Sequence, residues 1–347
     1  VMSKDVIQLV ETKRFDNDKP WGELLERLRV GACTAADCAL INARLYAKLS
    51  LEERRNFDRA PMLSSFNDVV DTWNNGTFPE AALANNRAQI YTWAHSDFVL
   101  TNTGRKTTGG NQSQSRDKQR LSERHRPAIY RILKDHNSFQ GNKLSNTKGR
   151  HRTLVYFVGC EYMITENDFL ARELGIVNGM RCTAVDIIFS DEDAVAETEA
   201  AAASTPGIPY RLAAAPACIM VQLKNPSVLR GRLLSYTNSS GTTEVLPLGV
   251  VPLFPTSSRD FTVDVLEIAP SLVERGVLGS SYKVVRVGYT LTLGYAFSDF
   301  KVQGESLDYA FCDVVKNNMG DTRGPYVILS RLKTLRSLAL LREVPLK

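Results

Sequence analysis

Residues suited to phosphate contacts lie close together near the end of the sequence, around a Gln-Gly pair. Ser298 and Lys301 offer a hydroxyl and an ammonium group, which suit phosphate contacts that fix position without reading a base sequence. Gly304 lets the backbone approach a ligand closely, and the neighbouring Gln303 amide can then reach a ribose or a phosphate. We therefore expect a phosphate-bearing ligand at this segment.

An arginine stands out in the apolar segment that follows. Arg331 lies shortly after the Gly324-Pro325 turn, at the start of a predicted helix, which would give it a rigid mount. An arginine held in this way can stabilise the negative charge that develops on a phosphoryl group during its transfer. The spacing alone leaves open the alternative that Arg331 merely faces solvent.

The two segments, residues 294–315 and 326–342, together resemble the last two signature motifs of Pif-one-like helicases. The phrase Gly-Tyr-Ala-Phe-Ser-Asp at residues 294–299 is closest to Helitron transposon helicases. The positions that match the first motif are Ser298, Lys301, Gln303, Gly304 and Ser306, and those that match the second are Tyr326, Val327, Leu329, Ser330 and Arg331.

Further segments resemble the same family in the same order along the chain. They are residues 9–31, 159–180 and 249–258. The resemblance does not extend to residues 102–152 or 192–215. The order and spacing of the segments make the resemblance specific, whereas any one of them alone would be weak.

The resemblance implies a motor that hydrolyses ATP with Mg²⁺ in a cleft between two RecA-like domains, of which this chain would supply the second. It implies that Arg331, and less securely Arg14, are catalytic arginines. Gln303, Gly304 and Arg331 would bind the nucleotide, and Ser298, Phe300, Lys301 and Ser306 would bind single-stranded DNA. Phe300 stands where many relatives have His, so it could stack on a base or belong to the core.

The phosphate loop G-x-x-x-x-G-K-[ST] is absent from the sequence, because Val99 stands where a loop ending at Gly104 to Thr107 would need its first glycine. Residues 187–192 imitate an apolar strand that ends in two acids, but solvated loop acids are the better interpretation. We therefore expect the chain to be the C-terminal half of the motor. Alone, it should neither bind ATP or Mg²⁺ nor hydrolyse ATP.

One segment holds all the excess positive charge. Residues 102–152 contain 13 lysines and arginines against three acidic residues, whereas the whole chain has a net charge of +5. This segment is polar, and we predict a long exposed loop with one short helix at 127–135 that binds nucleic acid loosely. A plain solvated loop is the alternative.

The six cysteines include no C-x-x-C pair, which argues against a zinc site. No apolar run is long enough to span a membrane, and the first residues do not resemble a signal peptide. We expect an intracellular, nuclear protein without a metal site.

Hydrophobic periodicity predicts an α/β fold with a run of short strands in its middle, consistent with a small β-barrel or sheet. The resemblance implies that the fold is a RecA-like domain with an inserted small β-barrel. The RecA-like part would comprise residues 1–150 and 287–347, and the β-rich insertion residues 151–286, with a flexible excursion at 192–215. Helices are predicted from Trp21 to Leu28, from the capping-box residue Thr34, around Phe66 to Trp73 before an Asn74–Gly76 turn, and from Tyr326. Strands are predicted at 153–158, 182–189, 217–223, 250–254, 261–268, 282–287 and 310–315.

The sequence thus favours the C-terminal half of an ATP-dependent DNA helicase, with the kind of role in DNA repair, recombination or transposition that the resemblance implies. Its expected partners are single-stranded DNA and the missing N-terminal RecA-like domain, and no membrane. The alternative is a non-catalytic nucleic-acid-binding remnant of a Helitron-like transposon helicase.

Overall fold

A computed structural model gives the fold as two compact units. The α/β unit comprises Val1–Asn75 and Tyr295–Lys347, and the β-rich unit comprises Gly76–Gly294. The structure describes residues 14–84, 89–102, 116–121, 127–133, 150–167, 174–189, 208–237, 241–314 and 323–345. Within these ranges no helix combines the length and the apolar character that crossing a membrane requires.

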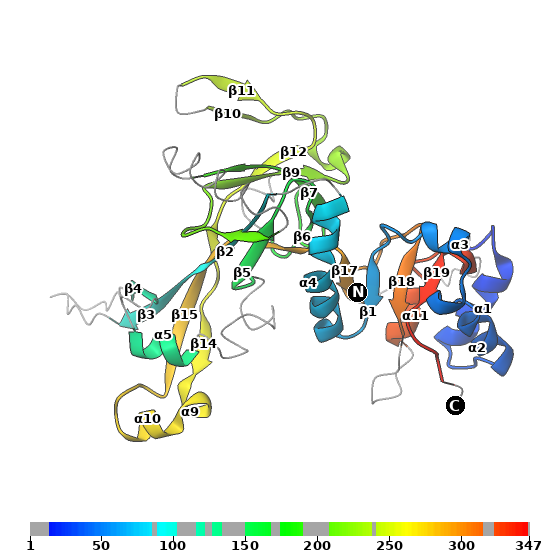
Figure 1. The fold of residues 1–347 in the computed structure, drawn as a ribbon, viewed down its shortest axis with the longest axis horizontal. Helices are drawn as coiled ribbons and strands as arrows, with labels where there is room; N and C mark the ends of the chain where they lie inside the picture. Colours follow the sequence, from blue (N-terminus) through cyan, green and yellow to red (C-terminus); the bar gives the residue numbers. More distant parts are fainter. Residues whose placement is uncertain are drawn as a thin grey trace, which may run out of the picture. The chain divides into compact units, whose positions relative to one another are not determined.

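A parallel four-stranded sheet forms the centre of the α/β unit (Figure 1). Its spatial order is β17-β1-β18-β19, and every neighbouring pair is parallel. The strands are β1 (Met62–Ser64), β17 (Ala296–Ser298), β18 (Ala310–Asp313) and β19 (Leu338–Leu340). Their side chains are almost all buried, as expected for a parallel sheet that is covered on both faces. The sheet confirms the predicted α/β class.

Helices of different lengths accompany this sheet. They are α1 (Lys19–Arg29), α2 (Ala35–Asn42), η1 (Tyr46–Lys48), α3 (Leu51–Arg55), α4 (Asn67–Ala84), α11 (Arg323–Leu329) and η3 (Leu335–Ser337). The predicted capping box of α2 is confirmed, because Thr34 and Asp37 each accept from the other's backbone N–H. Asp18 caps α1 and also accepts from the backbone N–H of Leu335, so this side chain joins the first helix to the last segment of the chain.

Two helix predictions need correction. The predicted turn at Asn74–Gly76 is wrong, because α4 continues through it. Asn74 is buried, and its side chain accepts from the backbone N–H groups of Tyr295 and Ala296 at 2.9 and 2.8 Å and so packs α4 against the start of β17. The helix predicted from Tyr326 ends at Leu329, and the apolar residues beyond it form strand β19.

The β-rich unit consists of separate hydrogen-bonded sheets. A five-stranded sheet has the order β12-β9-β7-β6-β16, a second has the order β13-β15-β3-β4 with β14 also on β15, β2 lies between β5 and β8, and β10 pairs with β11. The predicted small β-barrel is not confirmed. The strands are β2 (Ile90–Ala94), β3 (Ser96–Asn102), β4 (Arg116–Leu121), β5 (Thr153–Tyr156), β6 (Glu161–Ile164), β7 (Arg181–Ile188), β8 (Pro209–Arg211), β9 (Cys218–Leu223), β10 (Ser235–Thr237), β11 (Thr243–Val245), β12 (Val250–Leu253), β13 (Thr256–Ser257), β14 (Phe261–Asp264), β15 (Ser281–Gly288) and β16 (Leu291–Leu293).

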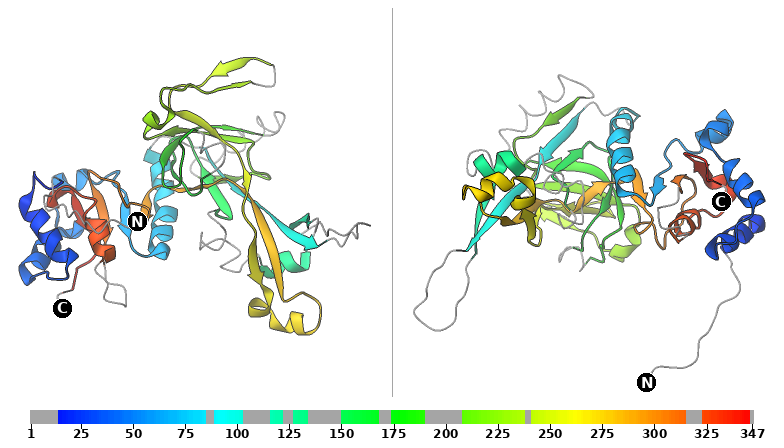
Figure 2. Two further views of the ribbon diagram at one scale, coloured as in Figure 1. Left: turned by 180° about the vertical axis from the view of Figure 1, so that it is seen from behind. Right: turned by 90° about the horizontal axis from the view of Figure 1, so that it is seen from below.

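Helical turns in this unit are short. They are α5 (Pro127–Leu133), η2 (Pro226–Leu229), α9 (Val265–Ile268) and α10 (Pro270–Glu274). The strand predicted over 261–268 is therefore half strand and half helix, since the Asp264 carboxylate caps α9. Helices α9 and α10 lie at the end of the β14–β15 ribbon that is remote from the five-stranded sheet (Figure 2).

The boundaries of the two units differ from the predicted ones. Strand β2 pairs with β5 and β8, and β3 pairs with β15, so residues 76–150 associate with the β-rich unit rather than with the parallel sheet. The segment 102–152, predicted as a loop, contains strand β4 antiparallel to β3 and the predicted helix as α5. Most of the rest of that segment, and residues 192–207, lie outside the described residues.

Candidate functional site

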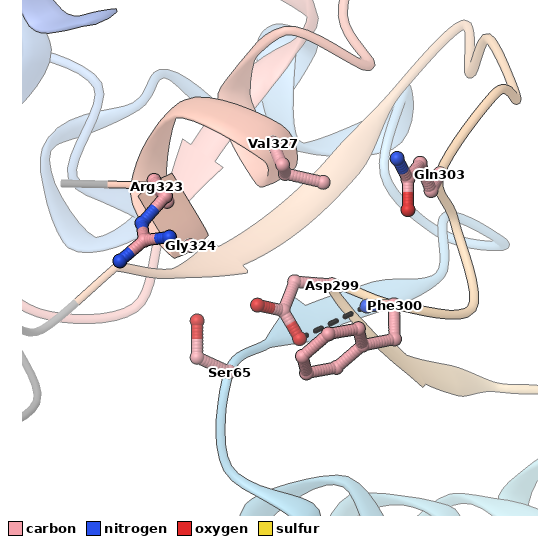
Figure 3. A pocket seen from close by; sticks show the side chains of 7 residues that line it. All are labelled: Ser65, Asp299, Phe300, Gln303, Arg323, Gly324 and Val327. Atoms are coloured by element: carbon pink, nitrogen blue, oxygen red, sulfur yellow. Dashed lines mark hydrogen bonds between the residues drawn. The ribbon is translucent and has the colours of Figure 1, made fainter. Parts of the chain in front are cut away.

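A cavity of about 430 Å³ opens in the α/β unit where β1 and β17 end (Figure 3). Ser64 and Ser298 are register partners in the two parallel strands, so the residues that follow them, Ser65 and Asp299, emerge side by side. Ligands of parallel α/β sheets bind at this carboxyl edge of the strands. The cavity is lined by Ser65, Asp299, Phe300, Gln303, Arg323, Gly324 and Val327.

Phe300 is the most exposed large apolar side chain that the structure describes, at 83%. This exposure excludes the core role that the sequence left open. Its neighbour Lys301 is half-buried, and that burial lowers the pKa of its ammonium group. The predicted DNA-binding residues Ser298, Phe300 and Lys301 therefore form one continuous stretch at the end of β17, and Phe300 lines the cavity.

Gln303 and Gly304 form an exposed tight turn, as predicted. Gly304 has a φ of +91°, which side chains other than glycine rarely adopt. The turn leads to β18 without an intervening helix, through a single bridge between Leu307 and Leu332. Gln303 lines the cavity, and Gly304 follows it in the sequence but is not among the lining residues.

Arg14 reaches this turn from the other end of the sequence. One of its terminal nitrogens donates to the carbonyl oxygen of Glu305 and to the hydroxyl of Ser306, both at 2.8 Å, and to the carbonyl oxygen of Arg331 at 3.3 Å. Its Nε is buried and has no hydrogen-bond partner within the described residues. Burial lowers the pKa of this guanidinium, and Tyr326 opposes the shift. Ser306, predicted to contact DNA, thus lies beside Arg14.

Arg331 is only 9% exposed. Its Nε donates to the carbonyl oxygen of Val327 at 2.8 Å, and Nη2 donates to the hydroxyl of Ser330 at 2.8 Å. Its Nη1 makes two long contacts of 3.4 Å, to the carbonyl oxygens of Val302 and Glu305. The guanidinium therefore fastens the end of α11 to the Gln303-Gly304 turn, and the predicted alternative of a solvent-facing side chain is wrong.

Two positive charges thus share one corner of the α/β unit, since both arginines donate to the carbonyl oxygen of Glu305. Within the described ranges neither guanidinium has an ion pair with a carboxylate. The pKa of Arg331 is lowered by burial first and by the charge of Arg14 second. Such a corner attracts anions, because a bound anion would relieve the repulsion between the two cations.

The described residues include no cluster of three or more His, Cys, Asp or Glu side chains that could hold a metal ion. The residues of this site that the sequence did not single out are Ser65, Asp299 and Arg323. Gly324 was noted only as a turn, but it also permits close packing. A Cβ on Gly324 would lie 2.6 Å from the Ser65 hydroxyl oxygen and 3.3 Å from an oxygen of Asp299.

Solved structures of similar fold are helicases. A crystal structure of Bacteroides Pif1 bound to ssDNA matches with a TM-score of 0.50 and 13% identity, over 98% of this chain and 52% of that one. The Candida albicans Pif1 helicase matches with a TM-score of 0.49 and 15% identity, over 96% and 55%. Bacteroides Pif1 in complex with ADP-AlF3 and ssDNA matches with a TM-score of 0.48 and 14% identity, over 98% and 52%.

These similarities concern the fold. The match to Bacteroides Pif1 shows that the chain has a Pif1-like fold, and the parallel sheet is consistent with a RecA-like domain. The chain spans about half the length of these helicases. No protein-family model matches the sequence, and no curated protein matches it.

Proposed function

We propose that this chain is the second RecA-like half of an ATP-driven DNA helicase, in which one loop serves both the nucleotide and single-stranded DNA. Residues 298–301 of that loop would contact DNA, and Gln303 and Gly304, together with Arg14 and Arg331, would face the nucleotide. A first RecA-like domain with a phosphate loop would complete the ATP site.

The observation that carries this proposal is that Arg14 and Arg331 both donate to the carbonyl oxygen of Glu305. This contact lies within a few residues of the exposed Phe300. A single short loop can therefore respond to a phosphate at one end and to a DNA strand at the other. Such proximity is what coupling of hydrolysis to movement along DNA requires.

The arginine corner suits a polyphosphate. The Nε of Arg14 has no partner within the described residues, and the long Nη1 contacts of Arg331 are weak enough to be exchanged for a phosphate oxygen. The nucleotide would supply the phosphoryl group, and the two guanidinium groups would stabilise its developing charge. The described residues include no cluster of three or more His, Cys, Asp or Glu side chains that could hold Mg²⁺. The first domain would therefore supply the Mg²⁺ ligands.

The DNA end of the loop suits a single strand. Ser298 ends β17 and Lys301 lies three residues further along the chain, so each could contact a phosphate, and the exposed Phe300 ring could stack on a base. Stacking tolerates any sequence, because every base has an aromatic face.

A second candidate function is a non-catalytic single-strand-binding protein of transposon origin. The extensive bonding of Arg331 to its own helix favours this alternative, since those donors would have to be released before they reach a phosphate. The two functions share the DNA end of the loop and differ only at the arginine corner.

Fluorescence anisotropy with a labelled oligo-dT of about 12 nucleotides tests the part that both functions share. Lys301→Ala should weaken binding by about 1 kcal/mol, as expected for one exposed phosphate contact among several. The exposed Lys333→Ala serves as the matched control and should change little. If the unaltered chain does not bind the oligonucleotide at all, the proposed function is wrong.

Hydrolysis then separates the two candidates. The chain alone should release no phosphate from ATP, with or without DNA. Joined to a phosphate-loop half, it should hydrolyse ATP and respond to DNA. A joined protein that folds and binds DNA but has no hydrolysis that depends on Arg14 or Arg331 would leave only the non-catalytic function.

A further inference from the structure

Charged, polar and aromatic side chains line the cavity at the ends of β1 and β17. Figure 3 shows the Asp299 carboxylate between the Ser65 hydroxyl and the Phe300 ring, the Arg323 guanidinium near Ser65, and the Gln303 amide apart from them. Its volume of about 430 Å³ lies within the range of roughly 300–1,000 Å³ that is usual for small-ligand pockets. The space is therefore adequate for a single nucleobase.

Asp299 and Arg323 place opposite charges in the lining of this cavity. The Asp299 carboxylate repels a phosphate and accepts from N–H donors, so a base of a strand that passes Phe300 suits this side of the cavity better than a phosphate does. One carboxylate oxygen accepts from the backbone N–H of Phe300 at 2.9 Å. No described side chain donates to the other oxygen, and this oxygen faces Ser65 and Gly324. The carboxylate thus remains available as an acceptor.

A carboxylate selects among bases by the donors that each presents. On its base-pairing edge, guanine carries two adjacent donors, the ring N1–H and the 2-amino group, which match the two oxygens of one carboxylate. Thymine has a single N–H between two carbonyl oxygens, which the carboxylate repels. Adenine and cytosine each offer an amino group beside a ring nitrogen that can only accept. Guanine therefore fits Asp299 best.

We infer that this cavity binds the base-pairing edge of a guanine within single-stranded DNA, with Asp299 accepting its two N–H donors and Phe300 stacking on its ring. This inference rests on the proposed single-strand binding and adds base selectivity to it. Asp299 would then be the residue that determines specificity.

The test compares anisotropy of labelled oligonucleotides of equal length, in which thymine alternates with guanine, hypoxanthine, adenine or cytosine, alongside oligo-dT. Alternation places a test base in the cavity in any register and avoids runs of guanine. Guanine should bind about tenfold more tightly than oligo-dT, as one bidentate contact predicts. Hypoxanthine lacks the 2-amino group and should lose most of that advantage. The ratios should not depend on salt, because the number of phosphates is constant.

Asp299→Asn and Asp299→Ala should remove the preference for guanine, so that the ratio between the affinities for the guanine-containing strand and for oligo-dT falls to about one. Asp58→Asn makes the same charge change at an exposed site of the α/β unit and should keep the preference. A chain that binds all the oligonucleotides equally would overturn this inference and leave the proposed function intact. A chain that binds none of them would overturn both.

Guanosine monophosphate distinguishes the source of the guanine. If it displaces the guanine-containing strand only at millimolar concentration, the strand is the ligand, as we infer. If it binds tightly and depends on Asp299 while no oligonucleotide is selected, the cavity recognises a free guanine nucleotide and the strand assignment is wrong.

Discussion

The guanidinium of Arg14 donates to the hydroxyl of Ser306 at 2.8 Å, although 292 positions separate the two residues in the sequence. Ser306 lies two residues after Gly304, and Arg14 precedes the first described helix. The two chain segments that make up the α/β unit are therefore joined at the place where the proposed nucleotide would bind. An anion bound there would therefore interact with both chain segments of this unit.

Arg14→Ala tests the proposed nucleotide corner. Arg14 is only partly buried but donates to Glu305, Ser306 and Arg331, so its loss should lower the free energy of unfolding by about 1–2 kcal/mol and leave the chain folded. In a motor completed with a phosphate-loop half, it should lower kcat for ATP by roughly a hundredfold, as removal of one charge-stabilising donor does. Steady-state phosphate release measures this. Arg59→Ala, at an exposed position, is the control, and equal rates for both variants would remove Arg14 from the site.

Arg331→Lys tests whether the hydrogen bonds of Arg331 stabilise the α/β unit. Lysine keeps the charge, but it cannot reach Val327, Ser330 and the 302–305 turn together, because it lacks the forked guanidinium. Carbonyl groups left without donors should reduce the free energy of unfolding by about 2 kcal/mol in urea denaturation. Arg336→Lys, whose side chain is exposed, should cost little. If both variants are equally stable, the bonds of Arg331 do not hold α11 to the turn.

Much of the α/β unit could be predicted because its signals are local. The Thr34-Asp37 capping box lies within four consecutive residues, and the apolar positions of α1 repeat at helical spacing. Strand β19 could not be found in this way. Leu338–Leu340 continue an apolar run, and only the pairing with β18 makes them extended. Strand β1 was missed for the same reason, since three residues between two parallel partners carry no alternation.

In the candidate site, too, local features could be predicted from the sequence, whereas contacts between distant segments could not. The spacing from Ser298 to Ser306 predicted a ligand-binding loop, and the exposed Phe300 and the Gln303-Gly304 turn agree with it. The contact between Arg14 and Ser306 depends on the whole fold of the unit. The part played by Asp299 follows from the register of β1 with β17, which brings Ser65 beside it and which no local pattern encodes.

A buried ion pair gives the β-rich unit a separate test. Arg286 and Asp97 join β15 to β3, their side chains are 0% and 5% exposed, and the closest contact is 2.8 Å. Asp97→Asn should cost about 3–5 kcal/mol, because it leaves the Arg286 charge buried without compensation. The pair of changes Asp97→Leu and Arg286→Met should cost less than the sum of the single changes. Urea denaturation of the unaltered chain, of Asp97→Leu, of Arg286→Met and of the double variant measures the coupling free energy between the two side chains.

The exposed pair Lys283–Asp260 offers the control, since Lys283 lies on the same strand β15 and its nitrogen is 3.2 Å from the Asp260 carboxylate. Asp260→Asn should cost less than about 1 kcal/mol. If the buried and the exposed pair give similar losses, burial does not set the cost of the unpaired charge.

His95 should make the β-rich unit sensitive to acid. Burial, followed by the nearby charges of Arg286, His151 and Arg150, lowers the pKa of His95 to about 3, and its hydrogen bond to the His151 carbonyl oxygen, 2.7 Å long, opposes this only in part. The ring is held as a neutral tautomer. Its Nδ1–H donates to that carbonyl, and its Nε2 accepts from the backbone N–H of Tyr289 at 3.3 Å. A proton on Nε2 would meet another N–H.

The sign of the pH dependence follows from this lowered pKa. An unfolded chain binds the proton near pH 6.5, and the folded chain does so only near pH 3, so the stabilisation is complete above pH 6.5 and is lost as the pH falls between these values. At pH 4 the loss should be about 3 kcal/mol. Hydrogen exchange at the amide of Tyr289, measured against pH, reports the opening of this contact. His95→Asn should be less stable at pH 7, yet it should show a flatter pH dependence from pH 6.5 to 4, because it has no imidazole to titrate. Equal slopes in the two proteins would mean that other groups cause the acid sensitivity.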